Sequence, residues 1–209
     1  SYCLTEPGSG SDAAALRTRA VRDGDHYVVN GSKAFISGAG VNEVYVTMVR
    51  TGEDGPRGIS CLVIDKDTPG VSFGANEHKM GWRNQPTAVV NFDNARVPVA
   101  NRLGAEGEGF KIAMSGLDGG RLNIGACSLG GAQRALDDAI AYTRTRNQFG
   151  KAIVDFQATQ FKLADMETEL QAARTLLYAA AAKVSANAPD KTKFAAMAKR
   201  LATDTGMSV

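Results

Sequence analysis

Apolar and polar residues alternate over short distances through the first hundred residues of the chain. Five runs rich in β-branched and aromatic residues are separated by turn-forming residues: Leu16–Val21, His26–Val29, Val44–Val49, Ile59–Ile64 and Ala88–Phe92. The first two runs flank Asp23-Gly24, a dipeptide typical of a tight hairpin turn. Asn30-Gly31 predicts a further turn. Short strands at close spacing, with no helical pattern between them, predict an antiparallel β-barrel or sandwich.

The pattern changes near Gly104, where helix-forming residues replace the β-branched clusters. A stripe at helical spacing then follows, made by Ala135, Leu136, Ala139, Ile140 and Thr143. Asp155 is expected to cap a second long helix. That helix should end at Pro189-Asp190, with a third helix beginning near Lys191.

These two patterns predict an α+β protein with two domains. Residues 1–103 form an antiparallel β domain of barrel or sandwich type, and residues 104–209 form the first part of a helical domain, an incomplete antiparallel bundle. The chain begins in strand-like sequence and ends in helix-like sequence without a stop signal. We therefore expect it to be a piece of a longer protein.

The composition and net charge of the chain argue against several classes of partner and site. The chain is 44% hydrophobic and 22% charged, with a net charge of +2, which is typical of a globular domain. So small a charge gives no electrostatic basis for binding nucleic acid or a membrane surface. The three cysteines, Cys3, Cys61 and Cys127, are far apart and odd in number. They predict neither a disulfide framework nor a metal site.

The stretch "TEPGSGSDAA" (Thr5–Ala14) contains a possible phosphate-binding loop. Gly8, Gly10 and Ala13 match the G-x-G-x-x-G/A fingerprint of a Rossmann loop, but that loop must open a helix. Here a hairpin pattern follows instead. Successive backbone N–H groups of a glycine-rich turn bind anions without a helix, so a phosphate cradle on a β domain is the favoured interpretation.

Six glycines between Gly116 and Gly131 lie in sequence that is otherwise helical. Each costs a helix about 1 kcal/mol relative to alanine. Two explanations stay open: the helix breaks near Asp118, or its backbone approaches another helix or a bulky ligand closely. Ala126–Gly130 nearly matches the G-x-S-x-G nucleophile elbow, but no histidine follows it. A helix contact is favoured there.

A series of motifs in order resembles the acyl-CoA dehydrogenase family. They are "YCLTEPGSGSD", "NGSKAFISGAG", "GISCLVIDKDTPGVSF", "KMGWRNQPTAVVNFDNARVPVANRLGAEGEGF" and "RTRNQFGKAIVDFQ". The resemblance covers essentially the whole chain. It implies an enzyme with FAD as cofactor, held by residues of the opening turn and the next strand: Tyr2, Leu4, Thr5, Gly10, Ser11, Phe35, Ile36 and Ser37.

The resemblance also implies individual roles. Thr5 is expected to hydrogen-bond the pyrimidine edge of the flavin, Phe35 to pack on its face, and Ser37 to approach N5. Ser11 is expected to contact both the FAD pyrophosphate region and the thioester of an acyl-CoA substrate. Simple turn capping is the alternative for Thr5 and Ser11.

Two further groups are implied in the helical part. Substrate-binding residues besides Ser11 are expected in a CoA-binding turn: Asp118, Gly119, Gly120 and Arg121. The FAD of a neighbouring subunit is expected to contact Arg146, Phe149, Phe156 and Gln157. This arrangement implies a homo-oligomer, in the form of a dimer of dimers. A solvated cation at a helix end is the alternative for Arg146.

No catalytic base is expected within these 209 residues. Most family members carry a glutamate base in a later segment. A minority carry it immediately before the arginine of the CoA turn, where this chain has Gly120. We therefore expect the base beyond Val209 and no turnover by this piece alone.

The implied reaction is FAD-dependent α,β-dehydrogenation of a short branched-chain acyl-CoA, with isobutyryl-CoA favoured by "MGWRNQPT", "VPVANRLG" and "GLDGGRLNIGACSLG". Electrons are expected to pass to an electron-transferring flavoprotein. The alternatives are an acyl-CoA oxidase-like flavoenzyme and a non-catalytic FAD- or CoA-binding scaffold subunit. The expected compartment is the bacterial cytoplasm, or the mitochondrial matrix in a eukaryote.

Overall fold

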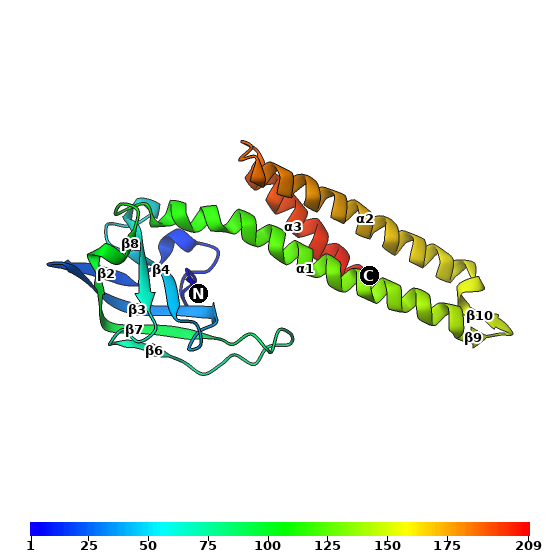
Figure 1. The fold of residues 1–209 in the computed structure, drawn as a ribbon, viewed down its shortest axis with the longest axis horizontal. Helices are drawn as coiled ribbons and strands as arrows, with labels where there is room; N and C mark the ends of the chain where they lie inside the picture. The colour runs from blue at the N-terminus through cyan, green and yellow to red at the C-terminus, as the bar shows by residue number, and fades with distance from the viewer. The chain divides into compact units, whose positions relative to one another are not determined.

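The computed structural model describes all residues, 1–209, and divides into two compact units. The β unit is Ser1–Met114 and the helical unit is Ser115–Val209. The β-branched runs of the first unit form eight strands: β1 Tyr2–Cys3, β2 Arg19–Asp23, β3 His26–Ser37, β4 Val44–Arg50, β5 Ile59–Asp65, β6 Val71–Phe73, β7 Thr87–Pro98 and β8 Arg102–Leu103. Figure 1 shows these strands in blue to green.

The strands form one sheet in the order β6-β7-β3-β2-β4-β5-β8, with β1 paired to β4 in parallel. The two ends of this order do not pair with each other, so the sheet is open and not a closed barrel. One register pair between β2 and β4 is also parallel, and the remaining ladders are antiparallel. The α+β class is therefore confirmed, with an open sheet in its β part.

The predicted hairpin is confirmed, whereas the predicted turn at Asn30-Gly31 is wrong. β2 and β3 pair antiparallel from Asp23 opposite His26 onward. β3 then runs through Asn30 and Gly31 without turning, and a β-bulge interrupts its pairing with β7 there. Gly31 has a φ of +141°, and a Cβ at this position would lie 2.7 Å from the Thr18 Cα. Close backbone approach explains this glycine.

Two clusters of buried side chains stabilise the sheet. The larger one lies around Tyr27, Tyr45 and Leu62, all of which are almost completely buried. The smaller one joins Leu4 and Met48 to the start of the first long helix. Burying a side chain of this size contributes roughly 1.5–3 kcal/mol to the stability of the fold, so both clusters stabilise the sheet.

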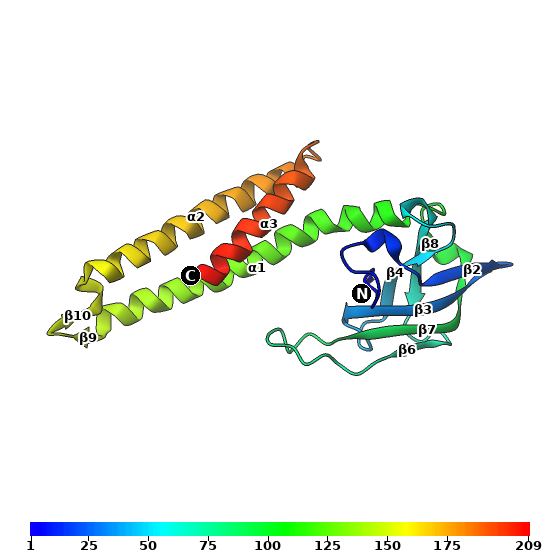
Figure 2. The same ribbon diagram turned by 180° about the vertical axis from the view of Figure 1, so that it is seen from behind.

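Three long helices follow: α1 Gly109–Thr145, α2 Gln157–Ser185 and α3 Lys191–Ser208. Between α1 and α2 lies a small antiparallel hairpin, with β9 at Asn147–Gln148 and β10 at Lys151–Ala152. Figure 2 shows the same elements from behind. No helix combines the length and the apolar character needed to cross a membrane.

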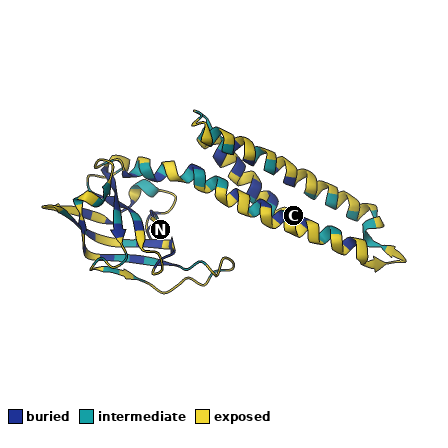
Figure 3. Cartoon of the chain, viewed as in Figure 1, coloured by how far each residue is buried: buried dark blue, intermediate teal, exposed yellow.

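Helix packing in the helical unit relies on small residues. The buried positions of α2 are Leu170, Ala173, Leu177 and Ala180, and those of α3 are Ala195, Ala198, Ala202 and Thr205. Both sets recur at the same helical spacing, and Figure 3 shows buried residues interrupting otherwise exposed helices. Alanine at these positions lets helix backbones approach closely.

One of the two explanations left open for α1 is excluded, and one expectation about α2 is corrected. α1 continues through Asp118 without a break. Asp155 does not cap α2, because it lies in the 3-10 helix Ile153–Asp155 and Phe156 occupies the N-cap without a side-chain hydrogen bond. The end of α2 before Pro189 and the start of α3 at Lys191 are as expected.

Candidate functional site

The opening loop, Thr5–Asp12, is a compact turn with an open outer surface. Glu6 and Ser9 exchange two backbone hydrogen bonds of 3.0 and 3.1 Å, and the Ser9 hydroxyl donates to the Asp12 carbonyl at 2.7 Å. Gly10 and Ser11 are exposed, and a Cβ added at Gly10 would meet nothing within 4 Å. The turn therefore presents backbone and a hydroxyl to an incoming group.

The end of β3 presents an aromatic ring beside a buried residue. Phe35 is 67% exposed and has a φ of +57°, whereas Ile36 is 2% exposed. The pairing of β3 with β7 shifts between Lys33 and Ile36, so a second bulge turns this segment. A left-handed φ is uncommon for a bulky residue and costs free energy. Strain of this kind clusters at ligand-binding sites.

A backbone hydrogen bond joins the opening loop to the end of β3, and a side-chain hydrogen bond joins Ser1 to the same end of the strand. The Ala34 N–H donates to the Thr5 carbonyl at 2.8 Å, and the Ser1 hydroxyl donates to the Ser37 carbonyl at 2.8 Å. The two motifs, about thirty residues apart in the sequence, therefore lie side by side. Thr5 is half-buried and the Ser37 side chain is exposed.

Tyr2 and Leu4 precede the loop and have different environments. The Tyr2 hydroxyl donates to the Ala113 carbonyl at 3.1 Å, and its ring is 41% exposed. Burial of the hydroxyl, with a smaller effect from Cys61, raises the pKa of Tyr2 to about 12. The Leu4 side chain is buried in the smaller core cluster. Leu4 therefore offers a ligand its backbone and not its side chain.

A buried ion pair lies behind the loop. Lys33 on β3 and Glu6 in the loop are 2.8 Å apart, with exposed side-chain fractions of 0% and 7%. Burial opposes the charged form of both groups, but Lys33 and the nearby N–H donors hold the pKa of Glu6 below its usual range. Burial lowers the pKa of Lys33, and Glu6 opposes that shift.

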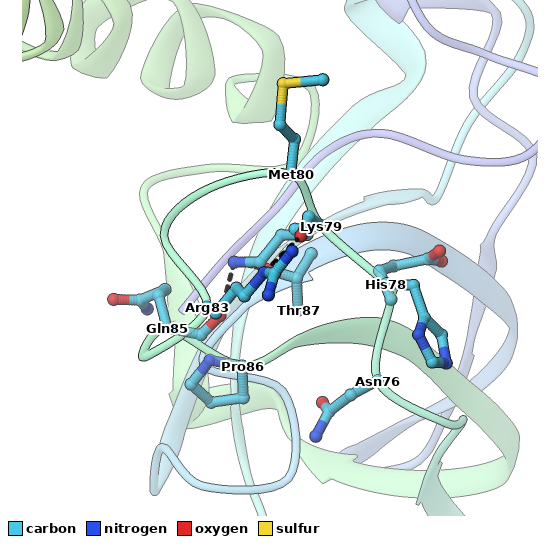
Figure 4. A pocket seen from close by; sticks show the side chains of 9 residues that line it. Asn76, His78, Lys79, Met80, Arg83, Gln85, Pro86 and Thr87 are labelled. Atoms are coloured by element: carbon cyan, nitrogen blue, oxygen red, sulfur yellow. Dashed lines mark hydrogen bonds between the residues drawn. The ribbon is translucent and has the colours of Figure 1, made fainter.

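The β unit has two cavities of note, of which only one includes residues of the opening loop. One, of about 490 Å³, is lined by residues of the opening loop, of the segment that follows it and of β3, including Glu6, Gly8, Arg17 and Ser32. The other, of about 740 Å³, is lined by residues between Asn76 and Thr87 (Figure 4).

Lys79 and Arg83 donate hydrogen bonds within the loop that lines the larger of these cavities. The Lys79 ammonium donates to the Gln85 carbonyl and to the Thr87 hydroxyl, the latter at 3.0 Å. The Arg83 guanidinium donates to the Lys79 carbonyl at 3.1 Å. Lys79 therefore closes this loop on itself, and no residue expected to bind FAD or substrate lines the cavity.

The expected substrate-binding residues of the helical unit lie on one helix and not in a turn. Asp118 is 6% exposed, and its two oxygens accept from Arg121 at 2.9 Å and from Thr192 of α3 at 2.8 Å. Asp118 therefore orients Arg121, which is itself half-buried. A Cβ at Gly119 or Gly120 would meet nothing within 4 Å, so this strip of α1 has open backbone.

Close helix packing explains a different glycine of the same series. A Cβ at Gly125 would lie 3.2 Å from the Leu177 side chain and 3.4 Å from the Ala202 side chain. Close approach of α1 to its neighbouring helices therefore explains Gly125. Gly119 and Gly120 have no such packing role within the helical unit.

Arg146, Phe149, Phe156 and Gln157 lie in or beside the β9–β10 hairpin. Phe149 is 94% exposed with a φ of +52°, and Gly150 beside it has a φ of +80°. Both values suit a two-residue hairpin turn. The rings of Phe149 and Phe156 meet edge to face with centroids 6.4 Å apart. Arg146 and Gln157 have exposed side chains.

The residues of the β unit fit a flat aromatic group that carries phosphates. An exposed ring offers a stacking surface, and a neighbouring glycine-rich turn with open backbone and a serine hydroxyl suits an anion. A flavin ring system and a pyrophosphate are both parts of flavin adenine dinucleotide (FAD). The comparison with known proteins agrees with this chemistry.

Two family models together match almost the whole chain. The model of the acyl-CoA dehydrogenase middle domain matches residues 1–95, and that of the C-terminal domain matches residues 107–209. The chain belongs to the acyl-CoA dehydrogenase family. The resemblance found in the sequence motifs is thereby confirmed.

Named relatives agree with this membership. The mitochondrial isobutyryl-CoA dehydrogenases of Dictyostelium discoideum and Bos taurus are 58% and 55% identical to the chain over 205 and 204 residues. Each match covers 98% of this chain and 49% of the relative. The chain thus spans about half the length of the curated relatives it matches.

Solved structures share the fold. Butyryl-CoA dehydrogenase from Megasphaera elsdenii matches with a TM-score of 0.94 and 44% identity over 98% of this chain and 54% of that chain. A structure named for the electron transferring flavoprotein of Acidaminococcus fermentans matches with a TM-score of 0.94 and 46% identity, covering 98% and 54%. An FAD-dependent dehydrogenase matches with a TM-score of 0.93 and 36% identity, covering 98% and 55%.

The motif-based prediction missed Glu6 and Lys33. A signal was present, because Lys33 is the only Lys, Arg, Asp or Glu between His26 and Ser37, and Glu6 is the only carboxylate before Asp12. Buried charges are rare unless they are paired. Charge pairing across 27 residues is nevertheless not readable from local patterns.

Proposed function

We propose that this chain forms part of an FAD-dependent acyl-CoA dehydrogenase that introduces an α,β double bond into a short branched-chain acyl-CoA, with isobutyryl-CoA as the favoured substrate. The observation that carries the proposal is the hydrogen-bonded pairing of the opening loop with the end of β3, where the Phe35 ring is exposed. Family membership supports the reaction class, and the identity to two isobutyryl-CoA dehydrogenases supports the acyl group.

The residues of the β unit bind and orient the cofactor in this proposal. FAD, when bound, supplies the acceptor for the electrons that leave the substrate. Gly10 and Ser11 hold its phosphates through backbone N–H groups and a hydroxyl, because both face open space. Phe35 covers the ring system and excludes water, while the hydroxyls of Thr5 and Ser37 orient its edge.

The helical unit binds the nucleotide end of the substrate. Arg121 supplies a charged donor for phosphate oxygens, and Asp118 fixes its direction through their 2.9 Å contact. Gly119 and Gly120 allow a ligand to approach the helix backbone, since no side chain of the helical unit lies within 4 Å of either Cβ position.

The exposed hairpin between α1 and α2 meets a second subunit in this proposal. Phe149 is almost fully exposed, and its position at a tight turn keeps it there. Arg146, Phe156 and Gln157 flank it and complete the cofactor site of the neighbour. The protein is accordingly a homo-oligomer, a dimer of dimers, that passes electrons to an electron-transferring flavoprotein. The bacterial cytoplasm remains the favoured compartment, with the mitochondrial matrix as the alternative.

Anaerobic mixing of the whole protein with FAD and acyl-CoA thioesters tests this function. We expect loss of the flavin absorption band to be fastest, per unit of substrate concentration, with isobutyryl-CoA, ahead of butyryl-, 2-methylbutyryl- and isovaleryl-CoA. Ser11→Ala should slow this reaction with every thioester. Ser72→Ala, an exposed serine on β6, serves as the matched control and should leave the rates unchanged.

Three outcomes separate the alternatives. Absence of bleaching with all four thioesters, despite bound FAD, contradicts the dehydrogenase and favours a scaffold subunit. Rapid reoxidation by air with stoichiometric peroxide favours an acyl-CoA oxidase. A preference for butyryl- over isobutyryl-CoA leaves the reaction class standing and overturns the branched-chain substrate.

A further inference from the structure

The Glu6–Lys33 ion pair is the most deeply buried pair of opposite charges in the molecule. The Lys33 ammonium is completely buried and lies 2.8 Å from the Glu6 carboxylate, which is 7% exposed. Removing two charges from water is costly, and their attraction offsets this cost only when further hydrogen bonds satisfy them. Apolar residues in the same volume are often as stable. The pair therefore calls for an explanation beyond stability.

Hydrogen bonds around the pair connect three separate backbone segments. The Glu6 carboxylate accepts from the N–H groups of Arg17 at 2.6 Å and Thr18 at 2.9 Å. The Lys33 ammonium also donates to the Leu4 carbonyl at 3.1 Å. The chain before the opening loop, the chain after it and β3 thus meet at one charged centre.

This centre adjoins both halves of the proposed cofactor surface. Ala34, the residue after Lys33, donates its N–H to the Thr5 carbonyl, which precedes Glu6. The bulge that exposes Phe35 begins at Lys33, where the pairing of β3 with β7 shifts. Thr5 and Glu6 of the loop are therefore joined to Ala34 and Lys33 of β3, the first pair by a backbone hydrogen bond and the second by the ion pair.

We infer that Glu6 and Lys33 are positioning residues that fix the register between the opening loop and the end of β3, and thereby align the phosphate-binding turn with the Phe35 ring. The inference rests on the proposed function, because it assigns the aligned surface to FAD. An apolar pair could fill the same space, but it would lack directional bonds and permit the loop to shift along the strand.

The test compares FAD binding by variants of the whole protein. Glu6→Gln keeps the shape of the side chain and removes its charge, and the double variant Glu6→Gln/Lys33→Met leaves no unpaired buried charge. Lys66→Met is the matched control, because Lys66 pairs with Glu43 at 3.1 Å on the surface. FAD affinity is measured by quenching of flavin fluorescence, the flavin absorption spectrum reports its surroundings, and circular dichroism reports folding.

We expect Glu6→Gln and the double variant to bind FAD about tenfold more weakly than wild type, the scale of one lost charged hydrogen bond. We also expect their bound-flavin spectra to shift toward that of free FAD, while Lys66→Met matches wild type in both measurements. A merely stabilising pair would change the unfolding transition and leave the spectrum of bound flavin unaltered.

The outcomes separate this inference from the proposed function. Folded variants that bind FAD within twofold of wild type, with an unchanged spectrum, overturn the positioning role and leave the function intact. Failure of the wild-type protein to bind FAD overturns both. If Glu6→Gln does not fold, because it leaves the Lys33 ammonium buried without its partner, the double variant decides alone, since it carries no unpaired buried charge.

Discussion

The β unit and the helical unit bury different kinds of side chain. The β unit encloses bulky and polar groups, among them Tyr27, Tyr45 and Lys33, which are at most 1% exposed. The helical unit buries mainly alanine and leucine, and its charged pairs lie at or near the surface except for the Asp118–Arg121 pair, whose carboxylate is buried. The β unit shapes its loops by directional hydrogen bonds from its interior, whereas the helical unit packs small residues and leaves Arg146, Phe149 and Gln157 exposed.

This difference has a functional meaning. In the β unit, side chains such as Arg50 donate from the interior to loop carbonyls, in this case those of Ala14 and Leu16. The cofactor-facing surface proposed there is therefore built by the unit itself. In the helical unit, Phe149 and Gln157 meet little of their own unit, which suits a surface completed by another subunit. The predictions below test this contrast.

The largest expected effect comes from unpairing a charge in the β unit. Lys33→Met leaves the Glu6 carboxylate buried without its cation, and should lower the free energy of unfolding by about 3–5 kcal/mol. Hydrogen exchange of the β3 amides measures this loss. Arg134→Met, which removes the exposed Arg134–Asp138 pair of α1, is the matched control and should have no measurable effect. Equal effects of the two variants contradict the contrast between the units.

Acid should destabilise the β unit through Glu6. The pKa of Glu6 in the folded protein lies below its ordinary value of 4.5, because Lys33 and N–H donors outweigh the effect of burial. Ionised Glu6 therefore stabilises the fold above pH 4.5, and this contribution is lost as the pH falls through the lowered pKa. Urea unfolding followed across that range should show the slope in wild type and a reduced slope in Glu6→Gln. An unchanged slope in the variant excludes Glu6 as its source.

The smallest expected effects come from two glycines of α1, and they distinguish a role in substrate binding from an effect on helix stability alone. Gly120→Ala and Gly130→Ala should each stabilise the helix by about 0.5–1 kcal/mol, because neither Cβ would meet another atom within 4 Å. Gly120→Ala should in addition raise the KM for acyl-CoA, whereas Gly130→Ala should not. Thermal unfolding and steady-state kinetics of the whole protein measure the two effects. An unchanged KM in Gly120→Ala removes Gly120 from the substrate site.

The sequence predicted those elements whose cause is local. The hairpin at Asp23-Gly24 and the break at Pro189 follow from the backbone preferences of the residues themselves. The turn predicted at Asn30-Gly31 is absent because β3 continues through these residues in its ladder with β7, and Gly31 instead serves the bulge of that ladder and the close approach of Thr18. The sequence left open whether α1 continues through Asp118, because helix propensity alone does not decide the conformation of a segment that tertiary contacts can stabilise.

In the candidate site too, local motifs predicted some residues, whereas residues that act through distant partners were missed. Motif resemblance located the opening loop and Phe35–Ser37, and the structure places them side by side through the Thr5–Ala34 hydrogen bond. The Glu6–Lys33 pair escaped prediction because its partners are 27 residues apart and belong to no local pattern. The roles of individual residues toward FAD and acyl-CoA stay predictions.

A crystal structure of the whole protein with bound FAD locates the cofactor directly. We expect the flavin ring system against Phe35–Ser37, the phosphates at Gly10 and Ser11, and an intact Glu6–Lys33 pair behind them. FAD bound elsewhere, for example in the cavity supported by Lys79, with the opening loop empty, would contradict this expectation.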